Sequence, residues 1–181
     1  LSTHPSIEQA WAMLIDAHAS TENHDAAETS FYLAQDALPD PSASVLVAMS
    51  GSLLSRNLLD RATWCAREAL KLDSSVQGGR LRLASALVAT GQGQQASQIL
   101  LQELREDPGN VQALLLHADV LAESGRTNEA CIKLHRVLEL EPANVDAHIR
   151  AGKFAMEDER WEEAFIAWGL VRRLYPSHPT A

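Results

Sequence analysis

Apolar residues recur along the chain at the spacing of an α-helix. In the segment that begins at residue 111, Leu114, Ala118 and Leu121 stand three or four residues apart, which places them on one helical face. The sequence has no sustained alternation of β-branched residues, which would indicate a strand, and no Asn-Gly turn, which would indicate a β-hairpin. The sequence therefore predicts an all-α fold.

The helical pattern recurs every 34 residues. Pro108, Pro142 and Pro176 are 34 residues apart, and each closes a helical stretch. An alanine stands twelve residues before each proline, and the register continues toward the N-terminus with one extra residue in the first connection: Ala27, Ala62, Ala96, Ala130 and Ala164. We therefore predict one array over residues 1–181, made of five repeats at 8–42, 43–76, 77–110, 111–144 and 145–178.

Each repeat is predicted to be a helix-turn-helix unit. Gly91 and Gly125 mark the turn in the third and fourth repeats, because glycine adopts positive φ at no steric cost and so ends a helix. The recurring alanine lies in the second helix, where a small side chain lets the two helices cross closely. Proline ends that helix, since it lacks an N–H and its ring clashes with the preceding turn.

The repeat resembles the tetratricopeptide repeat. Trp11, Leu14 and Phe31 stand at family positions of the first repeat, and small residues occupy the family's small position in the later ones: Ala84, Ala118 and Gly152. Ile15 and Ser50 depart from that position in the first two repeats. The resemblance implies ten helices in a right-handed superhelical solenoid, whose first helices line a concave groove that binds a protein or peptide segment.

The resemblance also implies which residues face the groove. We expect the partner-binding groove to be lined by Met13, Asp16, Val47, Leu54, Leu81, Arg82, Ser85, Leu115, Leu116, Asp119, Ile149, Arg150 and Lys153. Members of the family that hold a C-terminal carboxylate use Lys and Asn at two positions of the first repeat. Ala12 and Asp16 stand there, so we do not expect an acidic tail as ligand.

Charge and composition narrow the partners. The chain has 24 acidic and 15 basic residues and a formal net charge of −9, which disfavours nucleic acid. No apolar stretch is long enough for membrane insertion. Cys65 and Cys131 do not make a disulfide framework. They are compatible with a reducing compartment, so the cytoplasm is slightly favoured over the periplasm for a soluble protein of unknown location.

Motifs of catalysis and of metal binding are missing from the sequence. No histidine belongs to an HExxH or Cys-x-x-Cys arrangement. His117 and His148 fall in apolar helical stretches and are expected to be hydrogen-bonded core histidines. The GQGQQ segment at 91–95 is explained as a turn between helices, without a preceding strand. We therefore expect a non-enzymatic scaffold without cofactor or metal.

Other roles remain open. A self-assembly module would form a homodimer through the C-terminal helix around Trp168, Val171 and Leu174. No polar capping helix follows, so we expect that the native chain continues or that this helix contacts something else. The repeats could also be a docking segment of a larger bacterial secretion or carbohydrate-modifying protein. Binding of a small ligand in the groove is the weakest alternative.

Overall fold

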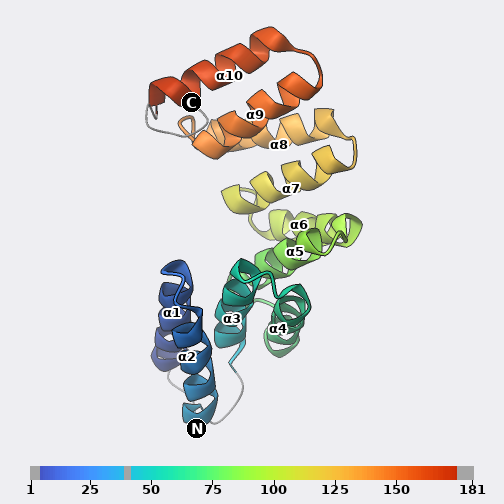
Figure 1. The fold of residues 1–181 in the computed structure, drawn as a ribbon. Coiled ribbons are helices and arrows are strands. Elements are labelled where there is room, and N and C mark those ends of the chain that lie inside the picture. The colour runs from blue at the N-terminus through green and yellow to red at the C-terminus, as the bar shows by residue number, and fades with distance from the viewer. Residues whose placement is uncertain (1–4, 39–41, 175–181) are drawn as a thin grey trace. The chain divides into compact units, whose positions relative to one another are not determined.

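Ten α-helices and no strand are formed by residues 5–38 and 42–174, the part of the chain that the computed structural model describes. In chain order they are α1 (Pro5–Ser20), α2 (His24–Ala37), α3 (Ala43–Ser55), α4 (Leu59–Leu72), α5 (Gly79–Ala89), α6 (Gly93–Glu106), α7 (Val111–Glu123), α8 (Thr127–Leu140), α9 (Val145–Glu157) and α10 (Trp161–Leu174) (Figure 1). The predicted all-α fold of helix-turn-helix units is confirmed. Pro176 and the end of the fifth predicted repeat lie outside the described residues.

The helices divide into two compact units. Unit 1 spans Leu1–Ile99 and unit 2 spans Leu100–Ala181, so the division falls within α6. In unit 1, α3 packs against α1, α2, α4 and α5. In unit 2, α7 packs against α8, α9 against α10, and α9 also against both helices of the preceding pair. Within each unit, neighbouring helix pairs therefore lie against each other, as repeats that cannot bury their apolar faces alone must do.

Each unit has its own apolar core. In unit 1, the buried side chains of Ile15, Met49 and Leu53 belong to one cluster that joins the first two helix pairs. In unit 2, Leu134, Val137 and other buried side chains of α7, α8 and α9 form a second cluster. Burial of this apolar surface is the main stabilising contribution in both units.

The recurring alanine is buried in every repeat. Its relative exposure is 0% in the first four repeats and 4% in the fifth, at Ala27, Ala62, Ala96, Ala130 and Ala164. A larger side chain would push the crossing helices apart, so the predicted role of this position as a close crossing point agrees with its burial.

The turns that join the two helices within each of the five repeats share one geometry. Gly91 and Gly125 have φ of 74° and 73°, as predicted, and the equivalent positions in the other repeats also have positive φ: Glu22 at 57°, Asn57 at 58° and Glu159 at 58°. The next residue donates its N–H to a carbonyl five residues back, as from Gln92 to Leu87 at 2.8 Å. This pattern is the Schellman motif that ends many helices. Two glutamates thus adopt a conformation that costs about 1 kcal/mol or more outside glycine.

Within the described residues, no helix has the length and the apolar character that a membrane crossing requires.

Asparagine is the residue before the first turn of several helices in these repeats. The side chains of Asn23, Asn110 and Asn144 each accept a hydrogen bond from the backbone N–H three residues on, which satisfies a donor left free by the helix geometry.

Candidate functional site

In unit 1, a charged side chain runs across the surface formed by the first helices of the repeats. Arg82 on α5 reaches toward Asp16 on α1, with Nη2 3.8 Å from the carboxylate Oδ1. On its way the guanidinium lies over Gly51 of α3, where an added Cβ would stand 2.8 Å from Arg82 Cζ. The missing side chain of Gly51 therefore makes room for this arginine to reach past the second repeat.

In unit 2, the corresponding surface carries a tighter ion pair. Arg150 on α9 donates to Asp119 on α7 through Nε at 2.8 Å and Nη2 at 3.0 Å. Its Nη1 also donates to the carbonyl of Asp146 at 3.2 Å. Both side chains of the main pair are about 30% exposed. A two-pronged arginine–carboxylate contact fixes both groups and contributes about 1 kcal/mol at such a site.

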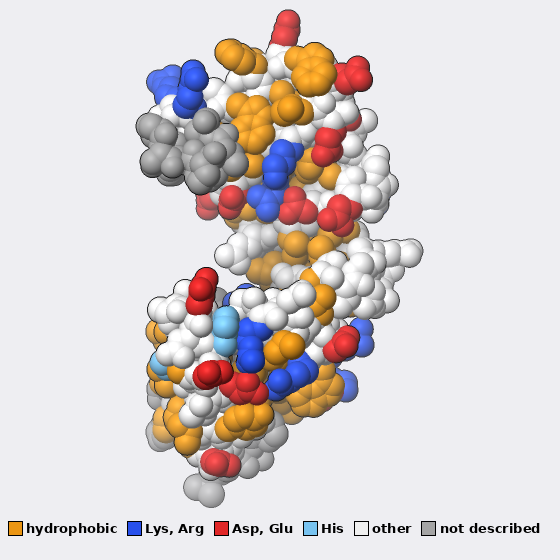
Figure 2. Space-filling view, in the orientation of Figure 1, with side chains coloured by type: hydrophobic (Ala, Val, Ile, Leu, Met, Phe, Trp, Pro, Cys, Tyr) orange, Lys and Arg blue, Asp and Glu red, His pale blue; other side chains and the backbone are white. Residues whose placement is uncertain are grey.

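These pairs change the expected character of the groove. The charges of Asp16, Arg82, Asp119 and Arg150 are directed at each other within their units, so a ligand meets them as balanced pairs. Figure 2 shows acidic and basic side chains next to one another near the middle of each unit. At these two pairs the surface is therefore close to neutral, although the whole chain is acidic.

The other predicted groove residues differ in burial. Val47 and Leu115 are each only 9% exposed and pack in the cores. The Ser85 hydroxyl donates to the carbonyl of Leu81, which reduces its capacity to bind a ligand. Half-buried apolar side chains remain at Leu54, Leu81, Leu116 and Ile149, whereas Met13 and Lys153 are exposed.

The sequence contained a signal for the second ion pair. Asp119 is the ninth residue of the repeat that begins at 111, and Arg150 is the sixth residue of the repeat that begins at 145. Both positions are expected to face the groove, and their opposite charges suggest contact. The Asp16–Arg82 pair has no such signal, because it joins the first repeat to the third. It depends on Gly51, a residue whose importance becomes clear only from the close approach of the guanidinium.

A separate apolar pocket lies among α2, α3 and α4 of unit 1. Its volume is about 280 Å³, and its lining consists of Phe31, Met49, Leu53, Asp60, Arg61, Trp64 and Cys65. Burial raises the pKa of the Cys65 thiol to about 11. The thiol is therefore protonated near pH 7 and is a poor nucleophile. Beside the pocket, hydrogen bonds from Arg56 and then Arg61 lower the pKa of Glu28.

The two histidines of the apolar stretches are buried. His148 is 8% exposed, and its Nε2 lies 3.0 Å from the carbonyl oxygen of Pro142, so it is a hydrogen-bonded core histidine as predicted. His117 is 2% exposed, and burial lowers its pKa to about 4. Among the described residues, no three His, Cys, Asp or Glu side chains form a group that could hold a metal ion.

Comparison with known proteins agrees with this architecture. The family model described as Tetratricopeptide repeat matches residues 81–134. No curated protein sequence matches the chain. Among solved structures, TTC0263, a thermophilic TPR protein of Thermus thermophilus, is 22% identical with a TM-score of 0.80, and the match covers 94% of this chain and 92% of that one.

Two further structures are similar over most of their length. YrrB, described as a TPR protein with an unusual peptide-binding site, is 19% identical with a TM-score of 0.69, and the match covers 94% of this chain and 87% of that one. A crystal structure of MamA is 15% identical with a TM-score of 0.73, and the match covers 90% of this chain and 95% of that one. At such identities the likeness establishes the fold.

Proposed function

Because the chain is built from tetratricopeptide repeats, a fold that generally serves as a protein–protein interaction scaffold, we propose that it binds a protein segment on the surface formed by the first helices of its repeats. The observation that carries the proposal is the half-buried apolar residues beside internally paired charges. The peptide-binding site of YrrB, a protein of the same fold, supports it as a precedent.

In unit 2, the surface suits a segment with apolar anchors. Leu116 and Ile149 are half-buried, so each still has apolar area that a ligand could cover. The Asp119–Arg150 pair beside them is fixed by two short hydrogen bonds. A ligand that covers this pair removes water from charges that already have a partner, so the free-energy cost of desolvation is small. Lys153 is exposed one turn beyond Ile149 and would favour an acidic residue in the ligand.

In unit 1, the surface differs in its anchor. Met13 is 72% exposed, and its unbranched thioether adapts to varied apolar partners. Leu54 and Leu81 are half-buried on the same group of helices. Arg82 is engaged with Asp16, and Ala12 offers no donor, which supports the expectation that a free C-terminal carboxylate is not the ligand.

The experiment is affinity capture from the source lysate, followed by mass spectrometry. The test variant is Ile149→Glu with Lys153→Glu, and the matched control is Ile132→Glu, which changes a 65% exposed isoleucine on the second helix of a repeat. We expect a partner that the control retains and the test variant loses, with helix content unchanged by circular dichroism. Affinity of about micromolar strength is expected for so small an interface.

An equal yield of every captured protein from the test and control variants would refute the surface in unit 2. The predicted Leu115 is unsuitable for this test, because a charge at a side chain only 9% exposed would disturb the core. The same recognition would serve a docking segment of a larger protein, so this experiment tests the surface and not its wider context. Self-assembly concerns a different face.

A further inference from the structure

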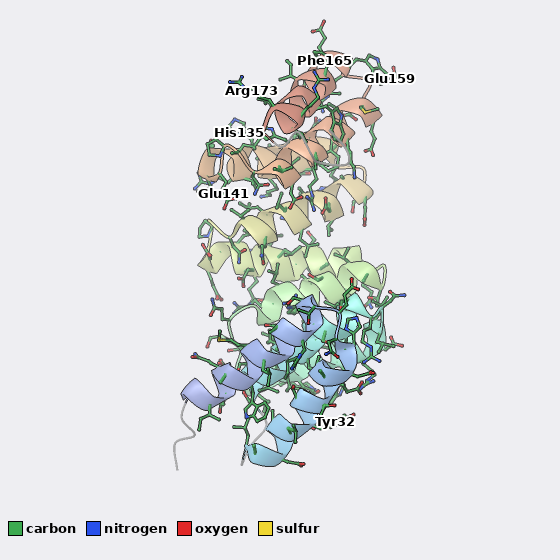
Figure 3. The ribbon with its side chains drawn as sticks, turned by 60° about the vertical axis from the view of Figure 1, so that its left-hand side comes forward. Tyr32, His135, Glu141, Glu159, Phe165 and Arg173 are labelled. Atoms are coloured by element: carbon green, nitrogen blue, oxygen red, sulfur yellow. The ribbon has the colours of Figure 1, made fainter. Side chains whose placement is uncertain are left out.

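The outer side of α10 carries three large exposed apolar side chains. Phe165 is 78% exposed, Ile166 62% and Trp161 61%. On the opposite side of the same helix, Val171 is fully buried and Ala164 nearly so. Figure 3 labels Phe165 and Arg173, and both point away from α9. The helix thus has a buried face toward its own repeat and a second, partly apolar face toward solvent.

The equivalent face of α8 is built differently. Cys131 stands where Phe165 does, 34 residues earlier, and is partly covered by the next repeat, with Arg160 Nη2 3.8 Å from its sulfur. His135 occupies the place of Gly169 and contacts Glu139 at 3.3 Å. Of these equivalent positions, only one holds the same residue in both helices: Ile132 on α8 is 65% exposed and Ile166 on α10 is 62% exposed. Phe165 and Gly169 therefore give α10 a surface that α8 lacks.

Gly169 lies near the middle of this face. A Cβ placed on it would have no contact within 4 Å apart from its chain neighbours and its own helix. Glycine in a helix interior costs about 1 kcal/mol relative to alanine, and nothing in the described part of the repeat requires it there. A second helix that approached closely over this position would make use of the missing side chain.

The sequence of α10 is complementary to itself when reversed. The centre of this symmetry lies midway between Ala167 and Trp168. Ile166 precedes that point by the same number of residues as Gly169 follows it, so the two lie opposite each other when a second copy of the helix runs in the reverse direction. Glu162 and Arg173 are likewise equidistant from that centre. These two lie about three helical turns apart and so on the same side of the helix. Neither has an ion-pair partner among the residues that the structure describes.

We propose that α10 pairs in antiparallel orientation with α10 of a second copy, so that the chain forms a two-fold symmetric homodimer. Ile166 of each copy lies over Gly169 of the other, and Glu162 of each lies beside Arg173 of the other. Phe165 is covered at the edge of the contact. In a symmetric dimer each contact occurs twice, which doubles the effect of both pairs.

This dimer differs from the one expected around Trp168, Val171 and Leu174. That expectation is wrong for Val171, because its side chain is fully buried against its own repeat and cannot reach a second copy. The terminal helix is retained as the contact, but its opposite side forms the interface. The proposal does not depend on the ligand surface of the first helices.

Helix electrostatics alone explain only part of the pattern. Acidic residues in the first turn and basic residues in the last turn stabilise an isolated helix through its dipole, and α10 has both. The dipole gives no reason for exposed Phe165 and Ile166 beside a glycine. The charge pairing and the apolar contact point to the same occupant, a second α10.

The size of the face predicts a weak dimer. Phe165 and Ile166, the two large apolar side chains of the contact, together expose about 300 Å² per copy. The resulting apolar contact of about 600 Å² lies below the usual range for stable complexes. We therefore expect a dissociation constant on the order of 10 to 100 μM.

The test is sedimentation velocity of the full chain from about 1 to 300 μM, a range that brackets this affinity. The wild-type mass is expected to rise from 19.7 kDa toward twice that value. Ile166→Glu is expected to remain monomeric, whereas the matched control Ile132→Glu associates like the wild type. Helix content by circular dichroism checks that each variant is folded.

Charge reversal provides a test that a merely unfolded variant could not pass. Glu162→Arg alone and Arg173→Glu alone each place like charges opposite one another, so each should remain monomeric. Mixed together, the two variants restore both pairs and should form a heterodimer. A wild type that stays monomeric at every concentration, an Ile132→Glu effect equal to that of Ile166→Glu, or a mixture that fails to associate would overturn the proposal.

Discussion

Two helical glycines with the same close approach should respond to alanine in opposite ways. At Gly51, an added Cβ would stand 2.8 Å from Arg82 Cζ, and at Gly152 it would stand 2.8 Å from Trp168 Cε2 and Nε1. Arg82 Cζ belongs to the end of a flexible side chain that is 41% exposed. The indole of Trp168 is rigid and packed against α9. The neighbour's freedom to move, not the distance, should therefore decide the result.

The expected magnitudes follow from this difference. Alanine in place of glycine inside a helix stabilises by about 1 kcal/mol. Gly51→Ala displaces Arg82 and loses its exposed contact with Asp16, a loss below about 0.5 kcal/mol, so the net result is stabilisation. Gly152→Ala forces the indole to shift, at a cost of about 1 to 3 kcal/mol for overpacking. The free energy of unfolding should then fall by about 1 kcal/mol.

Gly169→Ala is the control in the same unit, because its added Cβ would meet nothing within 4 Å. It should gain the full effect of helix propensity, about 1 kcal/mol. Urea unfolding followed by circular dichroism, at about 1 μM and so below the expected dimer range, measures all three variants. Equal stabilisation by Gly152→Ala and Gly169→Ala would refute the reasoning, since the indole contact would then have no cost.

Three more outcomes can be measured on the same chain. Glu159→Gly should raise the free energy of unfolding by about 0.5 to 1 kcal/mol, because glutamate is strained at the φ of 58° that this turn requires. Gly125→Ala should lower the free energy of unfolding for the same reason, and thermal unfolding compares the two variants. Burial lowers the pKa of His117 from 6.5 to about 4, so the unfolded chain binds a proton that the folded chain does not. Stability should fall by about 2 kcal/mol between about pH 7 and pH 5, and His117→Leu should remove most of that slope in urea titrations. The raised pKa of Cys65, about 11, predicts slow reaction with a thiol reagent at about pH 8, and a Cys65→Ala variant that still shows the slow phase would contradict it.

The repeat register predicted the fold because it is enforced by local chemistry. Ala96 and Ala130 are small where helices cross, and Gly91 and Gly125 have the positive φ that the turn requires. The same register extends the turn to Glu159, although glutamate itself gives no hint of a left-handed conformation. Periodicity thus carried information that residue identity at that position did not.

The surface was harder to predict because it depends on which charges meet. Helix position and opposite charge indicated a contact between Asp119 and Arg150, but its two short hydrogen bonds depend on side-chain directions that periodicity does not supply. Val47 and Leu115 lie at groove positions of the repeat and yet pack inward, because the same helical face must also bury its neighbour. The division into two units within α6 has no counterpart in the sequence pattern.

The contact between Asp16 and Arg82 also affects how unit 1 opens. In arrays of repeats, each unit is usually coupled only to its immediate neighbours. This pair links the first repeat to the third across Gly51, so it adds a coupling between second neighbours. When the first helix pair opens locally, Arg82 loses its carboxylate partner Asp16 while the second and third repeats stay folded. Opening of the first repeat therefore leaves the positive charge of Arg82 without its partner, two repeats away.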